Sequence, residues 1–145
     1  MNTSMYHVQD ETAMLTLGDK LARQCQEAFP DGALMILQGQ LGAGKTTLVR
    51  GFLQALGHVG TVRSPTYTLV ESYMLSRTVH HFDLYRISDA DELELTGFHD
   101  YLKQNAFCLI EWPECYPDLL SEADIRVMIE YHDDGRDVTI EIKNR

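Results

Sequence analysis

The residues best suited to chemistry form one short run, Gly39-Gln40-Leu41-Gly42-Ala43-Gly44-Lys45-Thr46-Thr47. Its spacing satisfies G-x-x-x-x-G-K-[ST], the phosphate-binding pattern known as Walker A. The glycines let successive backbone N–H groups turn inward around a polyphosphate, which a Cβ atom would obstruct. Lys45 offers a mobile positive charge to the β- and γ-phosphate oxygens, and Thr46 offers a hydroxyl that can ligate Mg²⁺. The run predicts a site for a nucleoside triphosphate with magnesium, and it leaves the reaction open.

Such a loop functions between a strand that precedes it and a helix that follows it. Ala33-Leu34-Met35-Ile36-Leu37 is a short apolar run that suits a buried parallel strand. After the loop, apolar residues recur at helical spacing, and Gly57 is a suitable residue to end that helix; they are Leu48, Val49, Phe52, Leu53 and Leu56. This context makes an accidental glycine-rich turn the weaker interpretation.

Two further strands are expected to end on acids. Ala106–Trp112 is an apolar run ending at Glu111, the pattern by which a Walker B strand delivers a carboxylate beside the loop to hold Mg²⁺ or its water. Thr78–Tyr85 is a second strand and contains Asp83 near its end. One acid would bind metal and the other would orient the attacking water or a switch loop, and the sequence does not assign the two roles. The alternative is that each acid simply ends a strand.

The segment from Thr61 to Tyr73 is rich in β-branched and aromatic residues and is interrupted by Pro65. We expect a loop to about Thr66 and an extended strand after it. In P-loop proteins the segment after the first helix often carries a switch that senses the γ-phosphate. Ser64 and Thr66 supply hydroxyls for such a switch, but an edge strand with surface hydroxyls fits the spacing equally well.

The other expected elements frame this central region. Asp10 is expected to cap a helix that runs to Ala28, and Ser88 to cap one that ends at Gly97. Two alternating runs flank a polar turn and predict a hairpin. The remaining expectations are a short helix over 98–102, a loop over 113–121 and hairpin strands over 125–131 and 138–142.

Composition limits the classes of function. The formal net charge of −10 argues against a broad phosphate-binding face for DNA or RNA, so a nucleic-acid role would run through a partner. No apolar run reaches the length of a membrane span, and the N-terminal residues do not resemble a signal peptide. We therefore expect one domain over residues 1–145, located in the cytoplasm, with no membrane contact.

Cysteine and histidine spacings offer no metal site. Cys25 and Cys108 lie on apolar faces and are expected in the core, whereas Cys115 lies in a loop. No C-x-x-C pair or zinc-like histidine spacing is present in the sequence. His80 and His81 are adjacent in a strand and so point to opposite faces, which argues against a metal shared by the two.

Four runs in the sequence together resemble one family. They are Gly39-Gln40-Leu41-Gly42-Ala43-Gly44-Lys45-Thr46-Thr47, Ser64-Pro65-Thr66-Tyr67-Thr68-Leu69-Val70-Glu71, His81-Phe82-Asp83-Leu84-Tyr85-Arg86 and Ile110-Glu111-Trp112-Pro113-Glu114. In this order and spacing they resemble the TsaE family (older name YjeE), small bacterial ATPases required for the threonylcarbamoyladenosine modification of tRNA. The second and third runs are specific to that family, whereas the first is shared by P-loop proteins in general.

The resemblance implies a role for each matching residue. Gly39, Lys45 and the loop backbone from Leu41 to Thr47, including Gly42, Ala43 and Gly44, would bind the phosphates of ATP or ADP. Thr46 and Glu111 would hold Mg²⁺. Lys45, Asp83 and Glu111 would be the catalytic residues, Ser64 and Thr66 would lie in the switch-like loop, and Trp112 would be functionally sensitive. Glu11 and Arg136 fall where family members approach the nucleotide.

The resemblance also implies partners. TsaD and TsaB form the pair that acts at adenosine 37 of tRNAs reading codons that begin with A. This chain would bind the pair and couple ATP hydrolysis to resetting it, touching tRNA only through the complex. From the residues alone, a small-molecule kinase remains an alternative, although no arginine-rich lid segment is visible, and so does a nucleotide-bound scaffold without turnover. A GTP switch would want N-K-x-D, which the sequence lacks.

The expected fold is α/β, of the three-layer P-loop NTPase type. Its central sheet should be mostly parallel, with the strands that begin near Ala33, Thr78 and Ala106 running in one direction. Antiparallel strands should lie at the margins and should include the hairpin between Ile125 and Ile142.

Overall fold

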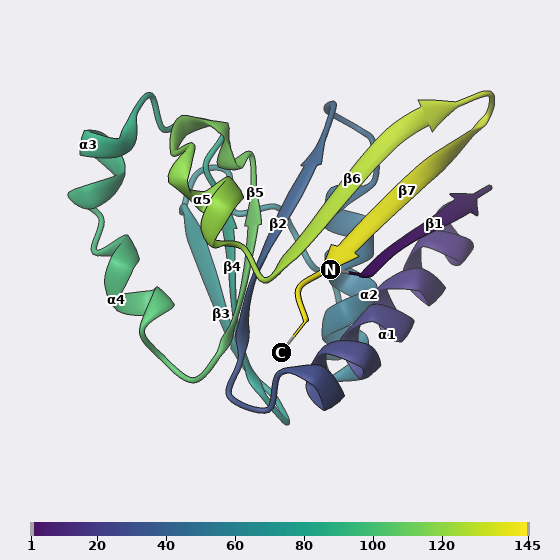
Figure 1. Ribbon diagram of the computed structural model, residues 1–145, viewed down its shortest axis with the longest axis horizontal. Helices are drawn as coiled ribbons and strands as arrows, with labels where there is room; N and C mark the ends of the chain where they lie inside the picture. Colours follow the sequence, from purple (N-terminus) through teal and green to yellow (C-terminus); the bar gives the residue numbers. More distant parts are fainter. Residues whose placement is uncertain (1, 145) are drawn as a thin grey trace.

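Seven strands join in one mixed sheet in the computed structural model, which describes residues 2–144. Their order is β1-β7-β6-β2-β5-β4-β3, with helices on both faces (Figure 1). Along the chain the elements are β1 (Asn2–Val8), α1 (Glu11–Ala28), β2 (Ala33–Gly39), α2 (Lys45–Ala55), β3 (Val70–Met74), β4 (Thr78–Asp83), α3 (Ala90–Glu94), α4 (Phe98–Leu102), β5 (Phe107–Glu111), the 3-10 helix η1 (Pro113–Cys115), α5 (Asp118–Glu122), β6 (Ile125–His132) and β7 (Gly135–Ile142).

The central strands β2, β5 and β4 are parallel, which confirms the expectation for them. Leu37 of β2 lies opposite Glu111 of β5, and Glu111 lies opposite Asp83 of β4. Parallel strands end at the same edge of a sheet, so the carboxyl ends of all three meet where β2 enters the glycine-rich loop. This register places both strand-end acids beside the loop.

The predicted hairpin is confirmed, but its place in the sheet differs from the expectation. β6 and β7 pair antiparallel, while β6 joins β2 in parallel, so the parallel centre includes β6. The antiparallel pairings are those of β6 with β7, β7 with β1 and β4 with β3, so β1 runs in the same direction as the central strands. β1 was not predicted, because most of its side chains are exposed and it is held by pairing to β7 rather than by an apolar face.

Helices cover the two faces of the sheet unequally. α1 and α2 pack on one face above a large apolar cluster, and α3, α4 and α5 cover the other face of β2, β5 and β4. The first pair packs at very short range through glycines. A Cβ on Gly18 of α1 would lie 2.2 Å from the Leu48 carbonyl oxygen, and one on Gly51 of α2 would lie 2.2 Å from that of Leu15. This contact fixes α2, whose first turn carries Lys45 and Thr46, against α1.

Two of the expected helix boundaries can be compared with the observed caps. Asp10 caps α1, since its carboxylate accepts a hydrogen bond from the Ala13 N–H at 2.9 Å, as expected. Ser88 was the wrong choice for α3: the cap is Asp89, whose carboxylate accepts from the Glu92 N–H at 2.9 Å. The difference follows from the backbone, because Asp89 is the extended residue directly before the helix.

Two expected connections also differ. The strand after the 61–66 loop begins at Val70 rather than near Thr66, because the Leu69 N–H donates to the Pro65 carbonyl at 2.8 Å and closes a turn. The segment 113–121, expected to be a loop, forms η1 and the start of α5. Leu119 anchors α5 by inserting, fully buried, into the second apolar cluster.

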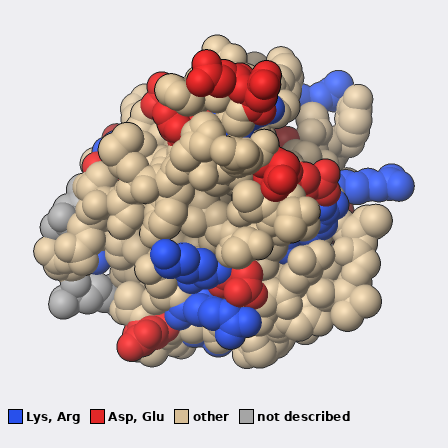
Figure 2. Space-filling view, turned by 90° about the vertical axis from the view of Figure 1, so that its right-hand side faces the viewer, with Lys and Arg blue, Asp and Glu red and all other residues tan. Residues whose placement is uncertain are grey.

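Charged side chains on the α1 side of the molecule are intermixed. Figure 2 shows acidic and basic groups side by side among uncharged residues on this face. On α1 the Arg23 guanidinium pairs with Asp19 at 2.9 Å, and the Lys20 ammonium lies 4.8 Å from the Tyr6 ring centroid. The net negative charge is thus not spread as a uniform acidic surface on this side. Among residues 2–144, no helix is both long and apolar enough to cross a membrane.

Candidate functional site

The glycine-rich loop connects β2 to α2 and wraps its backbone around a small hollow. Gly39 ends β2, residues 40–44 form the turn, and Lys45, Thr46 and Thr47 begin α2. Gly44 directly precedes the helix with φ +115°, a conformation that side chains rarely adopt, and a Cβ there would also meet Met14 at 2.9 Å. The hollow has a volume of about 210 Å³ and is lined by residues 41–47 together with Glu111 and Trp112.

Lys45 lies at the bottom of this hollow and is almost fully buried. Its ammonium donates a hydrogen bond to the Gly39 carbonyl at 2.7 Å and lies 3.3 Å from the ring centroid of Trp112. Burial lowers the pKa of Lys45, and the nearby carboxylates of Glu111, Glu114 and Asp83 oppose that shift. A buried cation held by one carbonyl and one ring retains donor capacity for an anion in the hollow.

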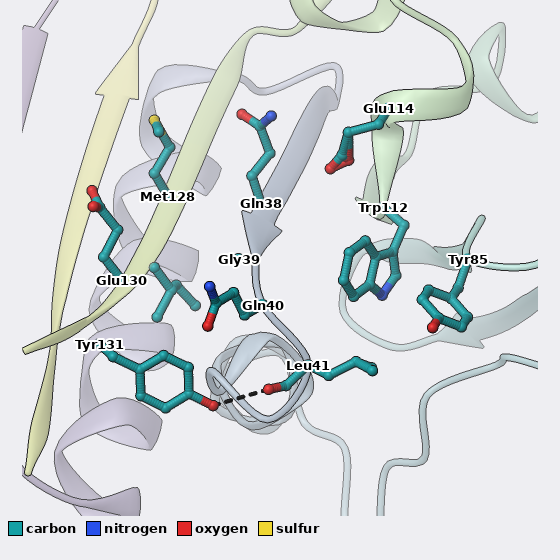
Figure 3. A pocket seen from close by; sticks show the side chains of 11 residues that line it. Gln38, Gly39, Gln40, Leu41, Tyr85, Trp112, Glu114, Met128, Glu130 and Tyr131 are labelled. Carbon is teal, nitrogen blue, oxygen red and sulfur yellow. Dashed lines mark hydrogen bonds between the residues drawn. The ribbon is translucent and has the colours of Figure 1, made fainter.

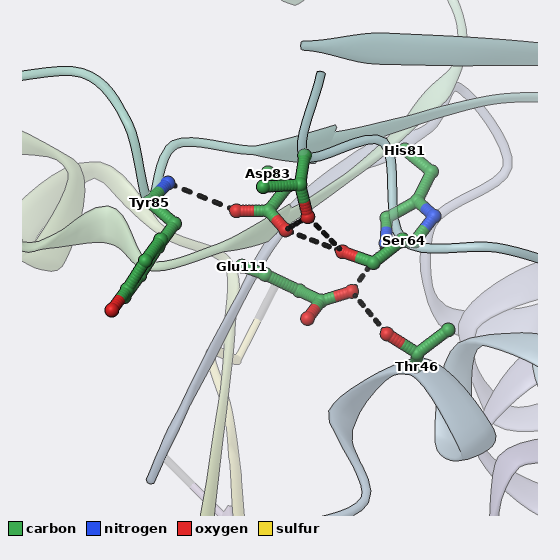
Figure 4. Close-up of polar contacts among 7 residues, drawn as sticks. Thr46, Ser64, His81, Asp83, Tyr85 and Glu111 are labelled. Carbon is green, nitrogen blue, oxygen red and sulfur yellow. Dashed lines mark hydrogen bonds and ion pairs between the residues drawn. The ribbon is translucent and has the colours of Figure 1, made fainter. Parts of the chain in front are cut away.

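Glu111 receives two donors on the same oxygen (Figure 4). The Thr46 hydroxyl donates to Oε2 at 3.0 Å, and Nε2 of His81 lies 2.6 Å from that oxygen. Because a carboxylate only accepts, the histidine hydrogen lies on Nε2. Nδ1 of His81 is buried with no hydrogen-bond partner among residues 2–144. The other oxygen, Oε1, is left without a protein donor in the described chain.

Asp83 is bound by the segment that follows α2. The Ser64 and Thr66 hydroxyls both donate to Oδ2, the latter at 2.9 Å, and the Tyr85 N–H donates to Oδ1 at 2.9 Å. The two strand-end acids therefore have different partners despite facing each other in the sheet. Glu111 is joined to the glycine-rich loop, and Asp83 is joined to residues 64–66, as Figure 4 shows for Ser64.

The β6–β7 hairpin supports the outer side of the loop. The Tyr131 hydroxyl donates to the Leu41 carbonyl at 2.9 Å, and Arg136 Nε donates to the Ala43 carbonyl at 3.1 Å. The Arg136 guanidinium also lies 4.0 Å from the Tyr131 ring centroid. Since these carbonyls point outward, the N–H groups of the same peptides are free to face the hollow.

Two larger spaces adjoin the hollow of the glycine-rich loop. One, of about 270 Å³, shares Gly42, Gly44 and Thr47 with it and is bounded by Glu11 and Arg136. Glu11, on the border of this space, also forms an ion pair with Arg50 of α2. The other is a cleft of about 810 Å³ that shares Leu41 and Trp112 with the hollow. The hollow lies between the other two spaces, because each of them shares lining residues with it and they share none with each other.

The donor set suits magnesium that arrives with phosphates. Thr46 and Glu111 supply a hydroxyl and a carboxylate oxygen, the hard ligands that Mg²⁺ prefers. Residues 2–144 contain no cluster of three or more His, Cys, Asp or Glu side chains that would hold a metal alone. A site with so few protein ligands fits an ion whose remaining ligands are phosphate oxygens and water.

The structure brings together most of the residues singled out in the sequence. The residues of the loop, Glu111 and Trp112 line one hollow, Asp83 with Ser64 and Thr66 lies beside it, and Glu11 and Arg136 border the adjoining space. Trp112 is partly buried against the second apolar cluster and has φ +57°, an uncommon conformation for such a residue. Sequence reasoning missed the contributions of His81 and Tyr131. His81 precedes Asp83 by two residues on a strand, which places both side chains on one face.

The strand–loop–helix unit beside the carboxyl ends of parallel strands, within this sheet, defines the fold of the P-loop NTPases. The crystal structure of Bacillus subtilis YdiB has the same fold, with a TM-score of 0.73, 27% sequence identity, and coverage of 97% of this chain and 86% of that one. The family model described as "Threonylcarbamoyl adenosine biosynthesis protein TsaE" matches residues 8–138, and on this ground the chain belongs to the TsaE family.

Curated relatives agree with this assignment. The chain is 47% identical over 142 residues to the Haemophilus influenzae protein named tRNA threonylcarbamoyladenosine biosynthesis protein TsaE, covering 97% of this chain and 90% of that protein. It is 36% identical over 110 residues to the Bacillus subtilis protein of the same name, covering 74% and 68% respectively.

Proposed function

We propose that this chain binds ATP with Mg²⁺ and hydrolyses it to ADP and phosphate as part of tRNA threonylcarbamoyladenosine biosynthesis. Family membership supports the biosynthetic role. The observation that carries the ATPase proposal is the contact between Thr46, in the first turn of α2, and Glu111, at the end of β5, directly beside the buried Lys45. A lysine, a hydroxyl and a strand-end carboxylate at one loop are the set that phosphoryl transfer requires.

Each residue has a defined task in this proposal. The N–H groups of residues 42–47 and the Lys45 ammonium bind the phosphates, with the N-terminal end of α2 favouring the negative charge. Thr46 and Glu111 would hold Mg²⁺, which when bound neutralises charge on the β- and γ-phosphate oxygens. Water attacks the γ-phosphorus, and the bond from that phosphorus to the bridging oxygen of ADP breaks, with a proton released to solvent.

We assign the two acids different roles on the basis of their contacts. Glu111 is the metal-side acid because it contacts Thr46. Asp83 is the switch-side acid because it binds the hydroxyls of Ser64 and Thr66. Asp83 would therefore link residues 64–66 to the state of the γ-phosphate. The space bordered by Glu11 and Arg136, next to Thr47, is our candidate for the ribose and base of the nucleotide.

We propose TsaD and TsaB as the partners, with hydrolysis resetting that pair between turnovers in the cytoplasm. The deciding experiment is phosphate release from ATP by the purified chain, alone and with the TsaD–TsaB pair. GTP and Glu111→Ala serve as controls. Stimulation by the pair, preference for ATP and loss of release in the variant are expected. Tight nucleotide binding without release under either condition would indicate a nucleotide-bound scaffold.

A further inference from the structure

We propose that the 810 Å³ cleft beside the phosphate hollow receives an arginine side chain from a partner protein, which would then lie next to the γ-phosphate. This inference rests on the proposed ATPase function. It names the chemistry of one further group, a positive charge that would stabilise the transition state of hydrolysis. It is carried by the position of the cleft, by the groups that line it and by the location of the chain's own arginines.

The position of the cleft follows from the hollow, which separates it from the smaller space. Thr47 directly follows Lys45 and Thr46 and lines both the hollow and the smaller space. Gly39 and Gln40, at the start of the loop, line the cleft on the other side. A nucleotide whose ribose and base occupy the smaller space has its γ-phosphate at the opposite end, toward Leu41 and Trp112. The cleft therefore begins where the γ-phosphate would end.

The walls of the cleft suit a cation with a flat, apolar face. Figure 3 shows one wall made by Trp112, Tyr85 and Glu114 and the other made by Met128, Glu130 and Tyr131, with Gln38 and Gln40 between them. The rings of Tyr85 and Trp112 pack with their centroids 4.9 Å apart. Aromatic faces attract guanidinium groups, and no lysine or arginine is among the residues that line the cleft.

Glu114 is the anionic group best placed to bind such a cation. Its carboxylate points into the cleft in Figure 3 and makes no hydrogen bond or ion pair within residues 2–144. It is close enough to the hollow for its charge to oppose the lowering of the Lys45 pKa that burial causes. Among the other acids, Asp83 accepts from two hydroxyls and an N–H, Glu111 accepts from a hydroxyl and an imidazole through Oε2, and Glu130 lies on the opposite wall of the cleft. An unpaired carboxylate beside a γ-phosphate repels it unless a cation lies between the two.

Within residues 2–144, no arginine lines this cleft. Each arginine among residues 2–144 has a contact elsewhere: Arg23 with Asp19, Arg50 with Glu11, Arg77 over Phe107, Arg86 over Tyr67, Arg126 with Glu141, Arg136 on the outer side of the loop, and Arg63 in a separate groove with Tyr67. In P-loop NTPases an arginine supplied in cis or by a partner stabilises the charge of the transition state. Since the arginines of residues 2–144 lie elsewhere, we infer that a second protein supplies this group, and an acid-lined cleft disfavours the phosphates of a nucleic acid as the partner.

The test uses guanidinium as the probe for the arginine side chain. ADP, Mg²⁺ and aluminium fluoride form a mimic of the transferred phosphoryl group, and Trp112, the one tryptophan in the sequence, reports its formation by fluorescence. Formation is measured with guanidinium chloride well below denaturing concentrations, and with methylammonium chloride or sodium chloride at equal ionic strength. The variants are Glu114→Gln and, as the matched control on α5, Glu122→Gln.

We expect guanidinium to lower the dissociation constant of the ADP–aluminium fluoride complex about tenfold or more. This is a fraction of the effect of an arginine supplied by a protein. Glu114→Gln should lose this gain while still binding ADP, and Glu122→Gln should keep it. Equal complex formation in sodium chloride and guanidinium, or a gain that survives Glu114→Gln, would overturn the inference while leaving the ATPase proposal intact. An equal gain with methylammonium would overturn the choice of arginine over lysine. Absence of ADP binding would overturn the proposed function and this inference with it.

Discussion

The imidazole of His81 and the carboxylate of Glu111 lie 2.6 Å apart in a region closed to solvent. The two residues come from neighbouring strands, β4 and β5, on the face that α2 covers. His81 and Thr46 both contact Oε2 of Glu111. The other oxygen, Oε1, therefore has no donor among residues 2–144. His81 is thus a positioning residue for the carboxylate that we assign to magnesium.

Replacing His81 should weaken the response to Mg²⁺ more than it weakens the fold. His81→Leu removes the donor, and loss of a group that orients a metal ligand typically costs about 10–100-fold in metal affinity. His81→Gln keeps an N–H donor and should recover part of the loss. The measurement is the Mg²⁺ concentration needed for ADP binding, followed by Trp112 fluorescence, with urea unfolding of each variant alongside. An unchanged Mg²⁺ requirement in His81→Leu would refute the positioning role.

The hydroxyl of Thr66 should hold the 61–69 segment closed. Thr66→Val removes a hydrogen bond to a charged group, worth about 1.5–3 kcal/mol, so the segment should open at least about tenfold more often. Trypsin cleavage after the exposed Arg63 measures that opening. Thr68→Val, a change in the same segment that does not touch Asp83, is the control. Equal cleavage rates in both variants would show that Asp83 does not hold the segment.

The hydroxyl of Tyr131 should contribute to nucleotide affinity without contacting the nucleotide. Tyr131→Phe removes its hydrogen bond to the Leu41 carbonyl, a loss of about 0.5–1.5 kcal/mol. Because that bond fixes a peptide of the phosphate loop, we expect ADP to bind roughly 2–10-fold more weakly. Tyr67→Phe, at a ring that is 84% exposed, is the control. ADP affinity is read by calorimetry, and equal affinities in both variants would exclude this support.

Thiol labelling should separate the three cysteines by burial. Burial raises the pKa of Cys25 and Cys108 to about 12, so at pH 8 almost none of either thiol is the reactive thiolate. The pKa of Cys115 is also raised, chiefly by burial, but this residue is partly accessible. We expect one thiol to react with a disulfide reagent in the folded protein, faster as pH rises, and three in denaturant. Cys115→Ser should abolish the folded-state reaction; a remaining reactive thiol would contradict the assignment.

Adding one methyl group at the glycine contact between α1 and α2 should lower the free energy of unfolding. A Cβ on Gly18 would meet the Leu48 carbonyl oxygen at 2.2 Å, so Gly18→Ala forces the helices apart. Overpacking of this kind costs about 1–3 kcal/mol, and the loss should exceed any gain in helix propensity. Gln24→Ala, at an exposed position of the same helix, is the control in urea unfolding. A Gly18→Ala variant as stable as this control would be inconsistent with the packing described.

Much of the central sheet and of the phosphate loop could be predicted, because their signals are local. An apolar run, a glycine spacing and helical periodicity all lie within about 25 residues around Lys45. The roles of Asp83 and Glu111 could not be separated, since they depend on which segment reaches each acid. Thr46 of α2 reaches Glu111, and Ser64 of the loop after α2 reaches Asp83. No sequence pattern specifies which of the two residues contacts which acid.

Elements that depend on distant pairing were missed or misplaced. β1 carries mostly exposed side chains, so it has no apolar alternation to detect, and only its partner β7 makes it a strand. The helix at Asp118–Glu122 is too short for a periodicity to be read and is held by the burial of Leu119. Asp89 and Ser88 are both good capping residues, so the choice between them rested on a backbone angle that composition does not encode.

The pairing of β1 with β7 also constrains how the chain reaches its native state. Asn2 lies opposite Ile142, so the edge of the sheet closes only when segments from opposite ends of the described chain meet. Closing a loop of that size carries an entropic cost that shorter-range pairings such as β6 with β7 avoid. Contacts of such long range slow folding. The hairpin should accordingly form early and β1 should join last, which leaves the β7 edge transiently open to intermolecular strand pairing during refolding.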